Sequence, residues 1–244
     1  MIEQVLKFAS TYEPRHAASI RGVPRSEITE LEHLIKHSLP SPYVEFLERM
    51  GRGLGAMDIE DANFTIDLVR RFYERRKDQP ASPFIFMGVR KSEPPVSYYI
   101  DSREKDESRQ PIVLVNSGSE ATDAASWPLF PSLQEMLYVY TFDSLRLRRL
   151  PYQRSLSSSF IRGEDGEMPG PATSLEEVEL LVLKMGFQRL PRTSDLNPLF
   201  DRKDSAILGH QNMLGGGFTL EFAGDDEHVV TTLSEILSDN LPLE

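Results

Sequence analysis

Apolar residues recur every three or four positions through the first 77 residues, a spacing that is typical of amphipathic helices. The pattern predicts helices over residues 1–10, 26–39, 41–50 and 65–77. In the third of these helices the buried stripe is expected to consist of Tyr43, Phe46, Leu47 and Met50.

The predicted helix 41–50 has clear start and stop signals. Ser41 suits the N-cap, and Pro42 suits the first helical position, where a proline loses no hydrogen bond. Gly51 is predicted to end the helix in a left-handed backbone conformation, which costs little only for glycine.

From residue 84 the pattern changes to short apolar runs between polar turns, which predicts strands over 84–90, 96–101 and 111–116. A long helix is predicted over 130–150. Residues 151–173 are rich in serine, glycine and proline, as linkers often are. The sequence therefore predicts a domain over 1–150 and a linker over 151–173. The remaining residues, 174–244, show a helix, four short strand candidates and a closing helix, and are predicted to form a small α/β module.

Composition limits the class of protein. The chain has 244 residues, of which 39% are hydrophobic and 27% charged, which indicates an ordinary globular chain. It has no apolar run of 18 residues, so we expect no membrane association. The N-terminus lacks the features of a signal peptide and cysteine is absent, which favours the cytoplasm.

The formal net charge of −11 makes the chain a poor ligand for nucleic acid and a better one for a basic protein. The alternative is that the acidity serves only solubility. Acids gather after the predicted helix 41–50, at Asp58, Glu60, Asp61 and Asp67, and we assign these four as candidate partner-binding residues.

A second charge pattern lies in the C-terminal half. Residues 144–163 contain five arginines and no acid, whereas residues 204–244 contain eight acids and no lysine or arginine. The two segments are expected either to face each other within the fold or to offer charged surfaces.

The glycines of the segment GRGLG, at Gly51, Gly53 and Gly55, superficially suggest a nucleotide loop. Such a loop follows a strand and opens a helix, so that phosphate meets the positive N-terminal end. Here the glycines follow a helix, at its negative end. We therefore interpret the segment as a sharp turn.

Two further patterns have simple structural explanations. His33 and His37 are expected to share a helix face, but no third metal ligand is evident, which favours a solvated face. Ser117 and Ser119 follow a strand but lack the flanking glycines of a hydrolase elbow, which favours a polar loop.

Residues 26–53 resemble the opening signature of the SMI1/KNR4 family, also called the SUKH superfamily. The matching residues are Ile28, Leu31, Glu32, Leu39, Pro40, Tyr43, Phe46, Leu47, Gly51 and Gly53. Later strands and the following helix are also similar, so the resemblance covers roughly residues 20–145. It implies an α+β fold with helices packed on a mostly antiparallel sheet, and it does not explain the predicted C-terminal module.

The resemblance also implies a function without catalysis. Bacterial members of this family are commonly immunity proteins that bind and neutralise toxins, and eukaryotic members are interaction proteins in cell-wall signalling. We therefore expect a cytoplasmic immunity protein that needs no cofactor or metal and binds a basic toxin domain. The alternatives are a regulatory or scaffold protein with an unrelated partner, and a hydrolase whose site the sequence does not reveal.

Overall fold

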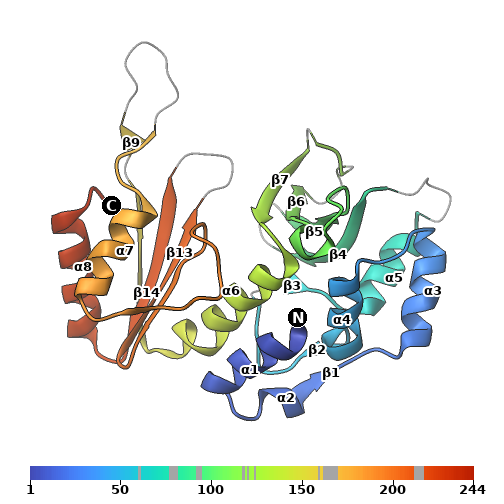
Figure 1. Ribbon diagram of the computed structural model, residues 1–244, viewed down its shortest axis with the longest axis horizontal. Helices are drawn as coiled ribbons and strands as arrows, with labels where there is room; N and C mark the ends of the chain where they lie inside the picture. The colour runs from blue at the N-terminus through green and yellow to red at the C-terminus, as the bar shows by residue number, and fades with distance from the viewer. Residues whose placement is uncertain are drawn as a thin grey trace. The chain divides into compact units, whose positions relative to one another are not determined.

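Figure 1 presents the computed structural model of the chain, coloured from the N-terminus to the C-terminus. It describes residues 1–59, 62–76, 82–91, 95–116, 119, 121–123, 125–158, 160–161, 170–211 and 217–244, with the backbone alone at 160–161 and 170–171. The chain divides into two compact units, Met1–Tyr140 and Thr141–Glu244. Both units combine helices with antiparallel strands, so the chain is α+β.

The helices of the first unit are α1 (Ile2–Tyr12), α2 (His16–Ser19), α3 (Arg25–Ile35), α4 (Ser41–Met50), α5 (Ile66–Glu74) and the 3₁₀ turn η1 (Glu107–Arg109). A further helix, α6 (Leu133–Leu145), begins in this unit. The four helices predicted before residue 80 are therefore confirmed, with small differences at their ends. The N-cap predicted at Ser41 is wrong, because α4 begins at Ser41 itself, Pro40 precedes it, and no side chain caps the helix.

The strands of the first unit are β1 (Ile20–Arg21), β2 (Gly53–Leu54), β3 (Ala62–Asn63), β4 (Phe84–Arg90), β5 (Val96–Asp101), β6 (Ile112–Asn116) and β7 (Ser126–Phe130). Strands β3 to β7 form an antiparallel sheet in chain order, and β1 pairs separately with β2. The predicted strands at 84–90, 96–101 and 111–116 are confirmed.

The long helix predicted over 130–150 is confirmed over Leu133–Leu145 and is shorter than predicted at both ends. Phe130 ends strand β7, which pairs with β6, and α6 begins only at Leu133. The helix ends at Leu145, and Leu147–Arg149 form the 3₁₀ turn η2. Strand β7 was not predicted, because Pro128 interrupts its apolar pattern and proline usually argues against a strand.

The apolar stripe of α4 lies in the core of the first unit. The side chains of Tyr43, Phe46 and Leu47 have 0% exposure. Tyr43 stacks on Phe46 with ring centroids 6.0 Å apart. The stripe is buried because the apolar positions of a helix recur on one face, which then packs on its neighbours.

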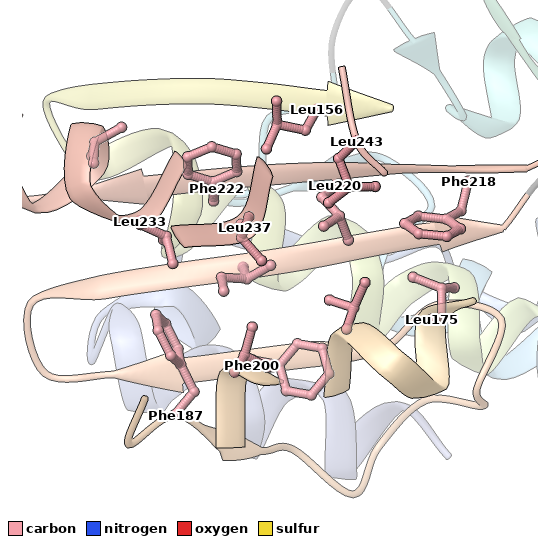
Figure 2. Packing of buried hydrophobic residues seen from close by; sticks show 14 residues of the cluster. Leu156, Leu175, Phe187, Phe200, Phe218, Leu220, Phe222, Leu233, Leu237 and Leu243 are labelled. Carbon is pink, nitrogen blue, oxygen red and sulfur yellow. The ribbon is translucent and has the colours of Figure 1, made fainter. Parts of the chain in front are cut away.

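The second unit contains β8 (Tyr152–Ser157), β9 (Phe160–Ile161), β10 (Gly170–Pro171), α7 (Leu175–Lys184), β11 (Gln188–Arg189), β12 (Leu199–Arg202), β13 (Ser205–Gln211), β14 (Phe218–Gly224) and α8 (Glu227–Asn240). Strand β9 pairs with β10, and five strands form an antiparallel sheet in the order β11-β12-β13-β14-β8. Figure 2 shows side chains of α7, α8 and this sheet meeting in one core.

The predicted linker over 151–173 is wrong for its first part. Residues 152–157 are strand β8, which pairs with β14 over its whole length. The strand is polar and mostly exposed, so its own sequence carries little strand signal. The turn η2 packs on β13 and β14, which explains why the unit boundary falls at residue 140 rather than at the predicted 150. Residues 159 and 162–169 of this segment lie outside the described part of the chain.

Arginines at the start of the second unit are used in part to join elements within it. Arg146 Nε lies 2.8 Å from Asp201 Oδ1, and its Nη2 donates to the carbonyl of Arg202 at 2.5 Å. Arg148 Nε donates to Asp143 Oδ2 at 2.8 Å. These two arginines therefore pair with acids outside residues 204–244, and not with the acidic segment that the sequence suggested.

Candidate partner-binding loop

The candidate loop begins at the end of α4, where Gly51 closes the helix by donating its N–H to the carbonyl of Leu47. The backbone of Gly51 is right-handed, with φ −66° and ψ −7°, so the predicted left-handed conformation is wrong. Glycine is required here for a different reason. A Cβ atom would lie 2.7 Å from Leu47 O and 2.8 Å from Val23 Cγ2.

The glycines that follow belong to a short strand and a turn. Gly53 and Leu54 form β2, which pairs with Ile20 and Arg21 of β1. Gly55 then adopts the left-handed conformation, with φ +69°, and a Cβ on it would meet Ser19 Oγ at 2.7 Å. The segment GRGLG thus turns the chain away from α4 and ties it to the preceding strand.

The loop beyond Gly55 is anchored by two buried side chains. Met57 is 4% exposed and Ile59 is 6% exposed, whereas Asp58 between them is exposed. The N–H of Ala62, the first residue of β3, donates to the carbonyl of Ile59 at 2.9 Å. Alternation of buried and exposed positions therefore directs Asp58 outward from an anchored backbone.

The returning chain is fixed where α5 begins. Asn63 Oδ1 accepts hydrogen bonds from the N–H and the hydroxyl of Thr65, at 2.9 and 2.8 Å. The N–H of Ile66 donates to the carbonyl of Gly51 at 2.9 Å, so the first turn of α5 is attached to the end of α4. Asp67 follows in that first turn, where a carboxylate complements the helix dipole.

Two of the four predicted binding residues can be placed. Asp58 and Asp67 are exposed, and neither side chain has an ion pair or hydrogen bond with the residues that the structure describes. Glu60 and Asp61 lie outside the described residues. The structure therefore shows two accessible carboxylates, Asp58 before strand β3 and Asp67 after it.

Neighbouring acids on α3 are in a different position, because arginines pair with them. Glu27 pairs with Arg52 at 2.5 Å, and Glu30 with Arg70 at 2.9 Å. Glu27 and Glu30 are thus neutralised by arginines of the same unit, whereas Asp58 and Asp67 have no such partner among the described residues.

A cleft of about 360 Å³ lies between the two ends of the loop. Its lining residues are Met50, Gly53, Leu54, Ala62, Asn63, Phe64, Thr65 and Lys91. The mixture of apolar side chains with one amide, one hydroxyl and one ammonium could accept a side chain of a partner. No sequence pattern predicted this cleft, because its walls come from three separate stretches of the chain, 50–54, 62–65 and 91.

The other candidates from the sequence do not gather into a site. Helix α3 ends at Ile35 and Lys36 has φ 57°, so His37 is outside the helix and does not share a helical face with His33. Ser117 lies outside the described residues, and the N–H of Ser119 donates to the carbonyl of Asn116 at 3.0 Å. Within the described ranges, no group of three or more histidine, aspartate or glutamate side chains could hold a metal ion.

Comparisons of the chain with protein-family models, with curated proteins and with solved structures find no match. None of the helices in the described parts of the chain has the length and apolar character needed to cross a membrane.

Proposed function

We propose that this chain is a non-catalytic immunity protein of the SMI1/KNR4 type, which binds a basic toxin domain through the loop after α4. The observation that carries the proposal is the exposed Asp58 on an anchored loop, between buried Met57 and Ile59. Asp58 is held between two buried side chains, and a residue held in this way loses little conformational entropy on binding.

The residues that resemble the family signature have consistent structural roles. Glu32 Oε1 accepts a hydrogen bond from the N–H of Leu39 at 3.0 Å, which ties α3 to the corner before α4. Tyr43, in the α4 core stripe, is fully buried, and burial raises the pKa of its hydroxyl well above the ordinary value. These residues hold together α3, the corner and α4, from which the loop begins.

Charge supports a basic partner. The chain has a net charge of −11, and Asp58 and Asp67 are exposed without a cationic partner in the described residues. An acidic surface attracts a basic one over a distance, which speeds encounter at low salt. The second candidate function, a regulatory or scaffold protein of the same type, is favoured by the same surface if its partner is also basic.

The first test is survival. The chain should be co-expressed with the toxic C-terminal domain of a large secreted protein, if a neighbouring gene encodes one. Rescue of growth would support the immunity function. Binding to a non-toxic basic partner, without rescue, would favour the scaffold function.

The second test separates the loop from net charge. Asp58→Lys with Asp67→Lys should slow association with the toxin domain about 10-fold at low salt and leave the fold intact. The matched control is Glu235→Lys with Asp239→Lys, which makes the same charge change at exposed positions of α8. Equal slowing by both pairs would contradict binding through the loop. An association rate that does not change between about 50 and 500 mM salt would contradict the attraction between charged surfaces.

A further inference from the structure

Strand β8 is the edge of the second unit's sheet, next to β14. Figure 2 shows the strand that carries Leu156 at the margin of the sheet. Leu156 is its one buried residue, and the remainder of β8 is exposed. An edge strand offers backbone N–H and C=O groups that no neighbouring strand uses.

The direction of these groups follows from the hydrogen bonds at the end of β8. Ser157 donates its N–H to the carbonyl of Glu244 at 2.6 Å and accepts from the N–H of Glu244 at 2.9 Å. Ser158 instead donates to the carbonyl of Phe218 at 3.0 Å, towards β14. Because successive residues of a strand alternate, Ser155 and Gln153 point to the open side, as Ser157 does.

The same edge already holds a piece of backbone. Leu243 forms an antiparallel bridge with Ser158, and Glu244 pairs with Ser157. The next two outward-pointing residues, Ser155 and Gln153, have no backbone hydrogen bond of this kind among the residues described. The edge therefore accepts antiparallel backbone at one end and is open over the rest.

The side chains of β8 define the chemistry of an incoming strand. Tyr152 is 41% exposed, and Arg154 is exposed and donates to Thr231 Oγ1 of α8 at 3.2 Å. These two side chains share a face, because they are two residues apart. Tyrosine and arginine are residue types that often dominate binding energy in interfaces.

A second copy of the chain pairs poorly in the register that uses both open residues, Gln153 and Ser155. In this antiparallel register, Gln153 of each copy pairs with Ser155 of the other. Arg154 of one copy then lies directly opposite Arg154 of the other. Like charges in that position destabilise a strand pair. An aspartate or glutamate opposite Arg154 stabilises the strand pair, because the two charges attract each other.

We propose that the β8 edge docks an extended segment of a partner protein, which adds antiparallel to Gln153 and Ser155 and places an acidic side chain opposite Arg154. Main-chain hydrogen bonds supply the affinity of such strand addition, and the side chain opposite Arg154 supplies specificity. This proposal is independent of the proposed function, since it concerns the second unit and a segment of opposite charge.

The test uses the full chain and two blocked pentapeptides, Thr-Val-Glu-Val-Thr and Thr-Val-Lys-Val-Thr, at millimolar concentration. We expect the glutamate peptide to slow amide hydrogen exchange at Gln153 and Ser155, and to bind about 1.5- to 5-fold more tightly than the lysine peptide. Arg154→Glu should reverse this preference.

Two variants of Ser155 test the backbone contact. Ser155→Pro removes an N–H that points away from β14, so the sheet should remain folded while peptide binding is lost. Ser155→Ala keeps the N–H and should keep binding. The proposal is overturned if neither peptide slows exchange, if the wild type and Arg154→Glu show the same preference, or if Ser155→Pro still binds. Slowed exchange on raising the protein concentration without peptide would also overturn it, because the occupant would then be a second copy.

Discussion

Helices α4 and α7 begin in different ways, one in each unit. The start of α4 has no side-chain cap of its own, and the N–H of Ser41 donates to Glu107 Oε2 at 2.8 Å, from a turn 66 residues further along the chain. Helix α7 has a local capping box, in which Ser174 and Glu177 exchange hydrogen bonds of 3.2 and 3.0 Å. The start of α4 thus depends on a contact with a residue distant in the sequence, whereas the start of α7 depends on four consecutive residues.

The two sheets show a related contrast at their edges. Strand β7 contains Pro128, which offers no N–H, and its side chains are largely half-buried. Strand β8 has an exposed arginine and part of its edge is occupied by Leu243 and Glu244. Both devices protect an edge from indiscriminate pairing. At β8, the backbone of Gln153 and Ser155 has no strand partner on the open side among the described residues.

The largest loss of stability is expected from substitutions in the two hydrophobic cores. Phe46→Ala in the first unit and Phe222→Ala in the second each remove a fully buried ring. Each should lower the free energy of unfolding by about 3–5 kcal/mol, measured by urea denaturation. Amide exchange should accelerate first in the unit that carries the substitution. Equal acceleration in both units would show that their cores unfold as one.

A smaller loss is expected where the sheet of the first unit meets the loop. A Cβ on Gly88 of β4 would lie 2.3 Å from Phe64 Cδ1 and 2.7 Å from the carbonyl of Asn63, so Gly88→Ala must displace β3. We expect a cost of about 1–3 kcal/mol. Gly53→Ala is the matched control, because its Cβ would have no neighbour closer than 3.6 Å. A similar cost for both variants would mean that backbone freedom, and not space, makes glycine necessary at position 88.

These contrasts explain which features could be predicted from the sequence. Central strands such as β5 and β13 carry continuous apolar runs, and α7 carries its own cap, so local patterns were sufficient. Strands β7 and β8 are defined by the neighbours with which they pair, and a proline or a polar pattern conceals them.

The candidate site shows the same limit. The exposure of Asp58 and the turn at Gly55 follow from local residue types. The cleft beside the loop depends on contacts between segments that are distant in the sequence, such as Leu54 and Lys91. The conformation of Gly51 was predicted wrongly, because glycine is needed there for space beside Leu47 and Val23 and not for a left-handed backbone.

The next prediction compares the two helix starts directly. Ser174→Ala should cost about 0.5–2 kcal/mol, because the N–H of Glu177 loses its acceptor. Ser41→Ala should change stability by less than about 0.5 kcal/mol, because the hydroxyl does not cap α4, its hydrogen bond to Glu107 lies in an exposed position, and the backbone N–H bond to Glu107 is retained. Urea denaturation of both variants measures the difference. A larger loss for Ser41→Ala would show that its hydroxyl caps the helix after all.

The smallest expected effect is on the pH dependence of the same two contacts. Hydrogen bonds from Ser41 hold the pKa of the Glu107 carboxyl below its ordinary value, and those from Thr173 and Ser174 do so for Glu177. A carboxyl whose pKa is lower in the folded state contributes stability that is present above the unfolded pKa, about 4.3, and is lost as pH falls through the folded pKa. The amide shifts of Ser41 and Ser174, followed by NMR from pH 6 downwards, should therefore each titrate below about 4.3. Glu107→Gln should abolish the titration at Ser41 and leave that at Ser174, and Glu177→Gln should do the reverse. A Ser41 amide that titrates at or above the ordinary glutamate value would show that the distant contact with Glu107 does not hold α4 in solution, and the contrast between the two helix starts would then be lost.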